Sequence, residues 1–309
     1  MKVDTIRILA LSFVFILVSL SDATAQSAHA PDHSDEIAEM ARSCSSAESG
    51  VSTFSDYLCL KGMITEQSGE DFARHISRTP KYVIVDSQGG SIRPAIHIAR
   101  LLHDYALPLV ISERCYSSCA NYLIPAASEL IALEGSLVVL HGHAPRNFSY
   151  FLALEMRQDQ EALALAQSGS LENKKLTHWT NEAFEKYQSE ITPLMQAEAS
   201  LFSVFMNVDM HYLFRFREVK RNIALYGSPS CRQRKSMLLI VDEDFLKEFG
   251  ISNITQYWWP NSELVLEKGL QQLGRDKTIV LGNDLFPSWI PGVGNTTRDI
   301  CALVRNHAD

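Results

Sequence analysis

The sequence predicts an α/β fold with a mostly parallel sheet, and two patterns support this prediction. Short apolar runs bounded by turn residues recur along the chain, which is typical of strands buried on both faces of a sheet. Stretches of helical length with one apolar stripe lie between several of these runs. Strands that alternate with helices indicate an α/β architecture in which neighbouring strands run parallel.

The expected elements follow one another along the chain. Strands are expected at residues 57–64, 82–85, 107–111, 130–133, 137–140, 237–241 and 278–281. Helices are expected around residues 72–76 and at 92–105, 150–166, 183–206 and 243–249, the last of them ended by Gly250. Residues 150–200 therefore form a helical insert in a domain that spans residues 51–260, and residues 261–309 form a C-terminal extension.

The N-terminus has the pattern of an export signal. Lys2 and Arg7 precede the apolar run 8–20, and small residues follow at Ala23 and Ala25. The run is shorter than the roughly 20 apolar residues that span a bilayer. We expect a signal peptide over residues 1–25, cleavage after Ala25, and a periplasmic or secreted protein without a membrane span after cleavage; an uncleaved anchor is the alternative. The polar residues 26–50 predict a flexible mature N-terminus.

Charge and cysteine content narrow the possible partners. The net charge of −8 argues against nucleic acid, whose binding proteins carry a basic patch. Six cysteines in an exported chain favour disulfides, and we expect the pairs Cys44–Cys59, Cys115–Cys119 and Cys231–Cys301. We expect no cofactor and no metal, because the possible pair of His141 and His143 has no third ligand.

Three segments carry residues suited to catalysis. A buried strand leads into Gly89 and Gly90 in the segment VDSQGGS, where backbone N–H groups are able to approach a ligand, although such turns are often only turns. Ser118 opens the apolar stretch in YSSCANYLIPAA, as a nucleophile or as a simple helix cap. His141 ends the apolar run of SLVVLHG, as a general base or as a core residue.

In this order and spacing, the three segments resemble the ClpP/crotonase superfamily and its serine-peptidase side. The segment MLLIVDEDFLKEFGISNIT resembles the same family's late strand and acidic helix. The resemblance covers about residues 55–145 and 195–257. It implies a spiral of repeated ββα units, a peptide or protein substrate, and possible self-assembly into a homo-oligomer.

The resemblance also implies roles for individual residues. Ser118 would be the nucleophile and His141 its base, with the N–H groups of Gly90 and Cys119 as the oxyanion hole. The family's orienting aspartate has no clear counterpart: Phe216 or Arg217 stands in its place, and Glu218 is the substitute we name, with Asp209 as the alternative.

Three functions remain open on this evidence. The first is an exported serine hydrolase, most simply a peptidase. The second is a non-catalytic ClpP-like module that binds peptides or assembles with itself, which the missing acid and the insert favour. The third is an acyl-CoA hydratase or isomerase of the crotonase branch, which would need an intracellular cofactor and no Ser/His pair.

Overall fold

A computed structural model describes residues 34–78, 80–141, 148–149, 151–152, 155, 174–205, 208–216, 237–273 and 278–281. Within these residues nine strands form one sheet, whose main path runs in the order β1-β2-β3-β4-β6-β7-β9. The strands are β1 (Gly50–Thr53), β2 (Tyr57–Ile64), β3 (Tyr82–Gly90), β4 (Leu109–Tyr116), β5 (Leu130–Ala132), β6 (Leu137–Leu140), β7 (Met237–Ile240), β8 (Ile254–Tyr257) and β9 (Thr278–Leu281).

Most strand pairs in this sheet are parallel. The antiparallel pairs are β1 with β2 and β6 with β7, whereas β2–β3, β3–β4, β4–β5, β4–β6, β5–β8 and β7–β9 run parallel. The predicted fold class, an α/β fold with a mostly parallel sheet, is confirmed. All seven expected strands are present, while β1 and β8 were not expected.

The sheet divides along β4. The first half of this strand pairs with β5, from Leu109 opposite Leu130 to Ile111 opposite Ala132. Its second half pairs with β6, from Arg114 opposite Leu137 to Tyr116 opposite Val139. Between the halves the register to β3 shifts, because Val85 lies opposite Ile111 but Ser87 lies opposite Cys115. This irregularity gives β4 two neighbours in turn and brings its end beside β6.

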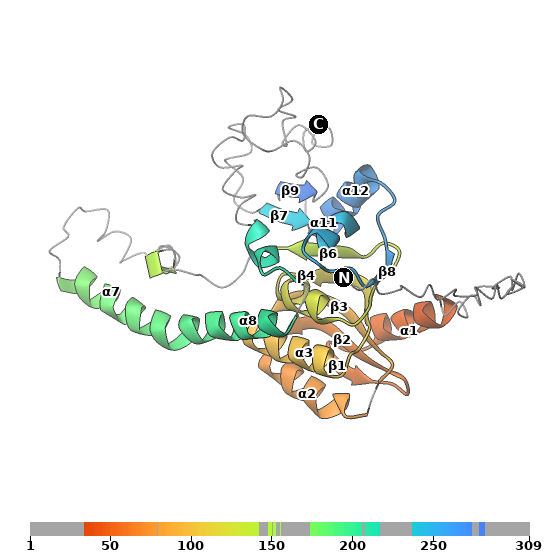
Figure 1. Ribbon diagram of the computed structural model, residues 1–309, viewed down its shortest axis with the longest axis horizontal. Helices are drawn as coiled ribbons and strands as arrows, with labels where there is room; N and C mark the ends of the chain where they lie inside the picture. The colour runs from red at the N-terminus through yellow and green to blue at the C-terminus, as the bar shows by residue number, and fades with distance from the viewer. Residues whose placement is uncertain are drawn as a thin grey trace, which may run out of the picture.

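One face of the sheet carries the main core. The helices α2 (Glu66–Ile76), α3 (Ile92–Asp104), α8 (Thr192–Val204) and α11 (Glu243–Glu248) contribute to this core, together with the short helical turns η1 (Cys119–Leu123) and α4 (Ile124–Ala126). The helices bury apolar stripes such as Ala95, Ile98, Ala99 and Leu102 of α3 against the strands. The α2 and α3 helices lie side by side along the lower part of the molecule (Figure 1).

Two further helices cover the opposite face at separate places. Helix α1 (Ser34–Ser46) packs Ile37, Met40 and Cys44 against the first halves of β2, β3 and β4. The expectation of a flexible segment over residues 26–50 is therefore wrong for residues 34–46, because the stripe of apolar side chains in this polar helix is buried.

Helix α12 (Ser262–Leu273) covers the other end of that face. Its Val265 and Leu266 are buried against β6 and β7, and β9 extends the sheet beyond β7. The expected boundary at residue 260 does not separate a distinct part of the described fold, since α12 and β9 share the same sheet and its apolar cluster.

The described part of the insert is helical. Helix α7 (Lys174–Lys186), the π-helical turn η2 (Tyr187–Ile191) and α8 follow one another as a long arm that projects from the body (Figure 1). Pro193 lies in the first turn of α8, where a proline is tolerated. The expected helix at 150–166 lies largely outside the described residues.

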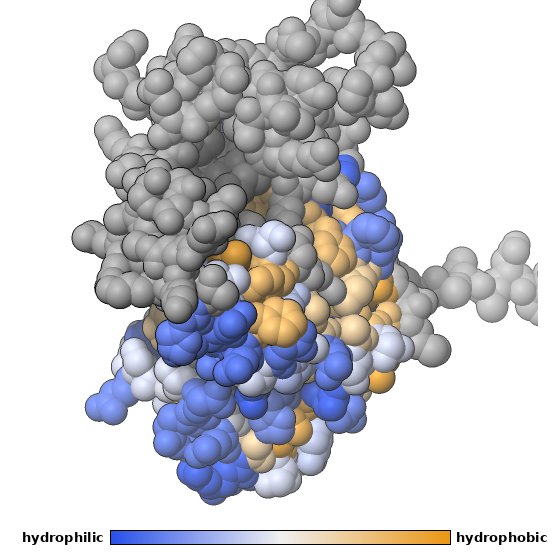
Figure 2. All heavy atoms as spheres, turned by 90° about the vertical axis from the view of Figure 1, so that its left-hand side faces the viewer, coloured by the Kyte–Doolittle hydropathy of each residue, from blue (hydrophilic) through white to orange (hydrophobic). Residues whose placement is uncertain are grey.

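Hydrophilic side chains cover the lower part of the face shown in Figure 2, at the height of α2 and α3 in Figure 1. This surface agrees with the inward apolar stripes of those two helices. Among the described residues, no helix is both long enough and apolar enough to cross a membrane.

Candidate active site

The three segments singled out in the sequence meet at one edge of the sheet. The strands β3, β4 and β6 are parallel neighbours, so their carboxyl ends lie at the same edge. β3 ends at Gly90, β4 ends two residues before Ser118, and β6 ends one residue before His141. The topology therefore places the two candidate catalytic side chains and the glycine loop at adjoining strand ends.

The glycine loop is packed so closely that side chains do not fit there. A Cβ atom on Gly89 would lie 2.4 Å from the carbonyl oxygen of Tyr116, and one on Gly90 would lie 2.1 Å from that of Ile64. Ser87 helps to fix the loop, because its hydroxyl accepts from Gly89 N–H at 3.0 Å and donates to Gly62 at 2.6 Å. The double glycine is thus required by the close approach of backbone on both sides.

Ser118 follows a strained turn at the end of β4. Ser117 has a φ of 53°, in the left-handed region that non-glycine residues rarely adopt. Its N–H donates to the carbonyl of Val139 at 2.9 Å, which ties the turn to β6 two residues before His141. The strained residue is thus Ser117, whereas Ser118 itself has right-handed helical dihedral angles and precedes the first residue of the helical turn that follows.

The nucleophile candidate contacts the glycine loop directly. The N–H of Gly90 donates to Ser118 Oγ at 2.7 Å, and this is the one hydrogen bond of that hydroxyl within the described residues. Ser118 is 2% exposed. The structure thus brings together Ser118 and Gly90, two residues that the sequence assigned to one site.

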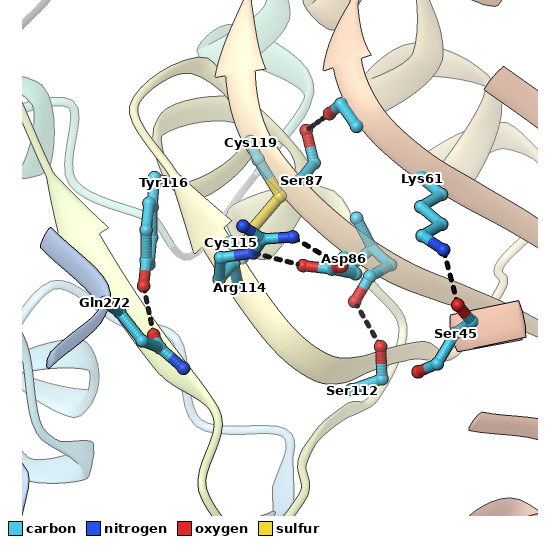
Figure 3. A network of polar contacts seen from close by, with 12 residues as sticks. Ser45, Lys61, Asp86, Ser87, Ser112, Arg114, Cys115, Tyr116, Cys119 and Gln272 are labelled. Atoms are coloured by element: carbon cyan, nitrogen blue, oxygen red, sulfur yellow. Dashed lines mark hydrogen bonds and ion pairs between the residues drawn. A yellow bond between two sulfur atoms is a disulfide. The ribbon is translucent and has the colours of Figure 1, made fainter. Parts of the chain in front are cut away.

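A disulfide fixes the segment on either side of Ser118. Cys115, the second-last residue of β4, is bonded to Cys119, the first residue of η1, and both are fully buried (Figure 3). The helix after Ser118 is shorter than the apolar stretch suggests: it consists of η1 and α4 and ends at Ala126. Pro125 explains the change, since it has no N–H to continue the regular helical bonding.

Two tyrosines hold the helical turn from behind. The Tyr122 hydroxyl donates to Glu198 Oε1 of α8, and both residues are buried. The Tyr212 hydroxyl donates to the carbonyl of Ala120 at 2.9 Å, and its complete burial raises the pKa of this phenol. The insert and the segment after it therefore pack directly on the residues that follow Ser118, a link the sequence did not reveal.

His141 lies at the surface with an aromatic neighbour. It is exposed, and its ring centroid lies 6.0 Å from that of Phe216, with an angle of 51° between the rings. Phe216 is one of the two residues, with Arg217, that the family resemblance placed where an orienting acid should stand. An apolar, buried side chain therefore lies beside the imidazole at this position.

The structure gives no support to Asp209 as the orienting acid. Its carboxylate accepts from the backbone N–H of His211 and contacts Nδ1 of the same histidine, both at 2.8 Å. These hydrogen bonds, that of the backbone above all, lower the pKa of Asp209. Asp209 thus pairs with a different, exposed histidine, and Glu218 lies outside the described residues.

An ion pair missed in the sequence lies on the opposite face of the same strands. Arg114 Nε and a terminal guanidinium nitrogen donate to the two Asp86 oxygens at 2.6 and 2.8 Å (Figure 3). Asp86 is buried, and the hydrogen bond to its carboxylate raises the pKa of Arg114. The sequence feature that pointed to this ion pair is the presence of two opposite charges at the ends of neighbouring apolar strands.

The second disulfide lies far from this edge. Cys44 of α1 is bonded to Cys59 of β2, as expected, while Cys231 and Cys301 lie outside the described residues. Two disulfides fit a protein of an oxidising compartment, such as the periplasm or the cell exterior. Among the described residues, no three His, Cys, Asp or Glu side chains lie together in a way that would hold a metal ion.

Comparison with known proteins adds a distant similarity. No family model and no curated protein matches the chain. Solved structures that match include two variants of the 1510-N membrane-bound stomatin-specific protease, one of them in complex with a substrate peptide. They are 18% and 17% identical, with TM-scores of 0.24 and 0.23, and each match covers 33% of this chain. The matches span 57% and 61% of those proteins, so this similarity leaves the function to be argued from the residues of this chain.

Proposed function

We propose that this chain is an exported serine hydrolase of the ClpP-like type, most simply a peptidase, which acts through Ser118 and His141. The observation that carries the proposal is the 2.7 Å hydrogen bond from Gly90 N–H to Ser118 Oγ. It supports a site in which a nucleophile and an oxyanion donor converge. The left-handed Ser117 and the adjoining strand ends provide the strand-to-helix turn that such a nucleophile requires.

The proposed reaction proceeds through an acyl-enzyme. The Ser118 hydroxyl rotates away from Gly90, transfers its proton to His141 and attacks the substrate carbonyl. The rotation frees the Gly90 N–H, which together with the N–H of Cys119 stabilises the oxyanion; one such donor typically contributes about 10²–10³-fold in rate. His141 then protonates the leaving group, and water, activated by the same histidine, releases the acyl group.

Export forms part of the same proposal. We propose that residues 1–25 are a signal peptide and that the mature chain acts in the periplasm or outside the cell. The two disulfides support this location, since such bonds persist in oxidising compartments.

One observation favours a second candidate function. The buried Phe216 beside His141 provides no hydrogen-bond acceptor to orient the imidazole. An aromatic side chain at one of the two positions that correspond to the family's acid departs from the catalytic pattern, so the second candidate is a non-catalytic ClpP-like module that binds peptides or assembles with itself.

Labelling by a fluorophosphonate probe separates the two functions. If Ser118 is activated, the exported protein should be modified at Ser118 at neutral pH, and Ser118→Ala and His141→Ala should each reduce the adduct at least tenfold. Asp209→Asn is the matched control, because it removes a carboxylate near His211 and should leave the labelling rate unchanged. Absence of labelling in the wild-type protein, or equal labelling of Ser118→Ala, would leave the binding module as the function.

A further inference from the structure

A cavity of about 480 Å³ opens beside the glycine loop, where β2 pairs with β3. It lies between the β1–β2 hairpin and the start of α2, and Gln88 of β3, which directly precedes the double glycine, also lines it. Its size falls in the range of about 300–1,000 Å³ that is usual for ligand pockets. The proposed reaction does not use it.

An irregularity in the sheet directs Gln88 toward this cavity. Gly62 lies opposite Ser87 and Met63 lies opposite Gly89, so Gln88 has no partner on β2 and is the extra residue of a bulge. Ser87 and Gly89 on either side of it are buried, whereas Gln88 is exposed. Bulges re-aim side chains near functional sites, and here the amide points into an open pocket instead of the core.

The cavity lies within reach of a substrate held at Ser118. Gln88 precedes Gly90 by two residues, which is about 7 Å along a strand, and β2 lies about 5 Å from β3. An extended peptide covers such a distance with about three residues. A substrate acylated at Ser118 would therefore place a neighbouring side chain at this cavity.

The lining of the cavity combines apolar surface, including the exposed side chain of Met63, with several polar side chains, and it carries no net positive charge. Gln88 and Ser49 make no side-chain hydrogen bond to any described residue, so an amide and a hydroxyl remain available to a ligand. Gln67 donates to Asp71, which also pairs with Arg74, and the carbonyl oxygen of Gln67 is left to accept. No lysine or arginine is among the described residues that line the cavity.

We propose that this cavity is a specificity subsite for an uncharged polar side chain of a peptide substrate, above all a carboxamide. A carboxamide is able to donate to and accept from the Gln88 amide at once, and Gln67 and Ser49 add an acceptor and a hydroxyl. An acidic side chain would meet the Asp71 carboxylate, whose cationic partner Arg74 is not among the residues that line the cavity. The inference rests on the proposed function for the identity of the substrate, but the binding itself is testable without turnover.

The test uses competition for Ser118 in the full exported protein. N-acetylated polyalanine hexapeptide amides carry one Gln, Glu, Lys or Leu at each position in turn, and each peptide competes with fluorophosphonate labelling. At the peptide position whose side chain reaches the cavity, the Gln peptide should protect Ser118 from labelling at least tenfold better than the Glu peptide. Gln88→Glu should shift the preference from Gln to Lys by at least tenfold, because the cavity then contains an unpaired carboxylate.

The matched control is Gln256→Glu, the same change at an exposed position of β8. It should leave the peptide ranking unchanged, while circular dichroism shows that both variants fold. A labelled protein whose ranking is the same in Gln88→Glu would overturn the subsite and leave the hydrolase function standing.

A parallel arm measures binding of the same peptides, with a fluorescent label, to Ser118→Ala protein by anisotropy. If the wild-type protein is not labelled, the hydrolase function fails, and this arm alone decides the subsite. A preference for Gln over Glu that Gln88→Glu abolishes supports the subsite; equal binding of all peptides overturns it.

Discussion

The two disulfides of the described chain stabilise different kinds of structure. Cys44–Cys59 closes a loop of 15 residues and ties α1 to β2, where Lys61 also donates to the Ala47 carbonyl at 2.9 Å. Cys115–Cys119 spans four residues and encloses Ser118 between a strand end and a helical turn. The first bridge attaches a whole element to the sheet, whereas the second fixes the direction of a few backbone groups.

The difference shows that the same bond serves stability in one region and local geometry in the other. In the α1 region the interacting groups all have partners in the fold: the apolar stripe is buried, and the end of the helix and Lys61 are hydrogen-bonded. The Ser118 region combines a left-handed serine with backbone contacts that leave no room for a Cβ atom. Strain of this kind is maintained only by the surrounding structure, and it is common at functional sites.

The largest effect, on stability and labelling together, is expected from a methyl group on Gly89, which lies against the strained turn at Ser117. Gly89→Ala adds a Cβ at a φ of +83° that would lie 2.4 Å from the Tyr116 carbonyl. Left-handed strain and overpacking together should lower the free energy of unfolding by about 3 kcal/mol. Because the backbone at Ser118 must shift, fluorophosphonate labelling should also fall at least tenfold. Urea unfolding and the labelling rate measure the two effects.

Gly135→Ala is the control for that change. Gly135 also has a positive φ of +78°, but a Cβ there would meet only the flexible end of Lys268. It should cost about 1 kcal/mol of stability and leave labelling unchanged. Equal losses of labelling in the two variants would contradict a specific role for the Gly89 contact.

A smaller effect, on stability alone, is expected from removal of the Cys44–Cys59 bridge in the α1 region. Replacing Cys44 and Cys59 by alanine removes a 15-residue closure, which the chain-entropy model values at about 3 kcal/mol as an upper figure. The labelling rate of the folded protein should stay within twofold of the wild type, because α1 lies on the face of the sheet away from Ser118. Reduced labelling at full folding would break the proposed division between the two regions.

Much of the fold was predictable because its strands are nearly uniform apolar runs. Three strands have the expected bounds, because turn residues lie at both ends of each apolar run; these are residues 57–64, 137–140 and 278–281. Helix α1 was missed although Ile37, Met40, Ala41 and Cys44 follow helical spacing, because the polar composition around them favoured a flexible segment. The pattern was present, and the composition outweighed it.

The site was predictable only in part, for a different reason. Gly90 and Ser118 stand in segments with recognisable local patterns, and the structure brings them together. The left-handed Ser117, the buried Phe216 beside His141 and the Asp86–Arg114 pair depend on how distant strands and helices pack. No local pattern of a single sequence specifies such tertiary contacts.

Of the two disulfides, the shorter one is expected to have the smaller effect on stability. Replacing Cys115 and Cys119 by alanine opens a closure of four residues, worth about 2 kcal/mol at most in the chain-entropy model. The backbone N–H of Cys119 would then lose the constraint of the bridge, and the left-handed Ser117 would be held by its remaining backbone hydrogen bonds, such as that to Val139. We therefore expect labelling at Ser118 to fall about tenfold, a larger loss than the Cys44/Cys59 variant shows despite the smaller loss of stability.

Reduction of the wild-type protein would not separate the bridges, so the two double variants are compared side by side by urea unfolding and by the labelling rate. If both variants label at the wild-type rate, the Cys115–Cys119 bridge contributes to stability alone, and the position of the Cys119 N–H is set by the packing of Tyr122 and Tyr212 behind the turn.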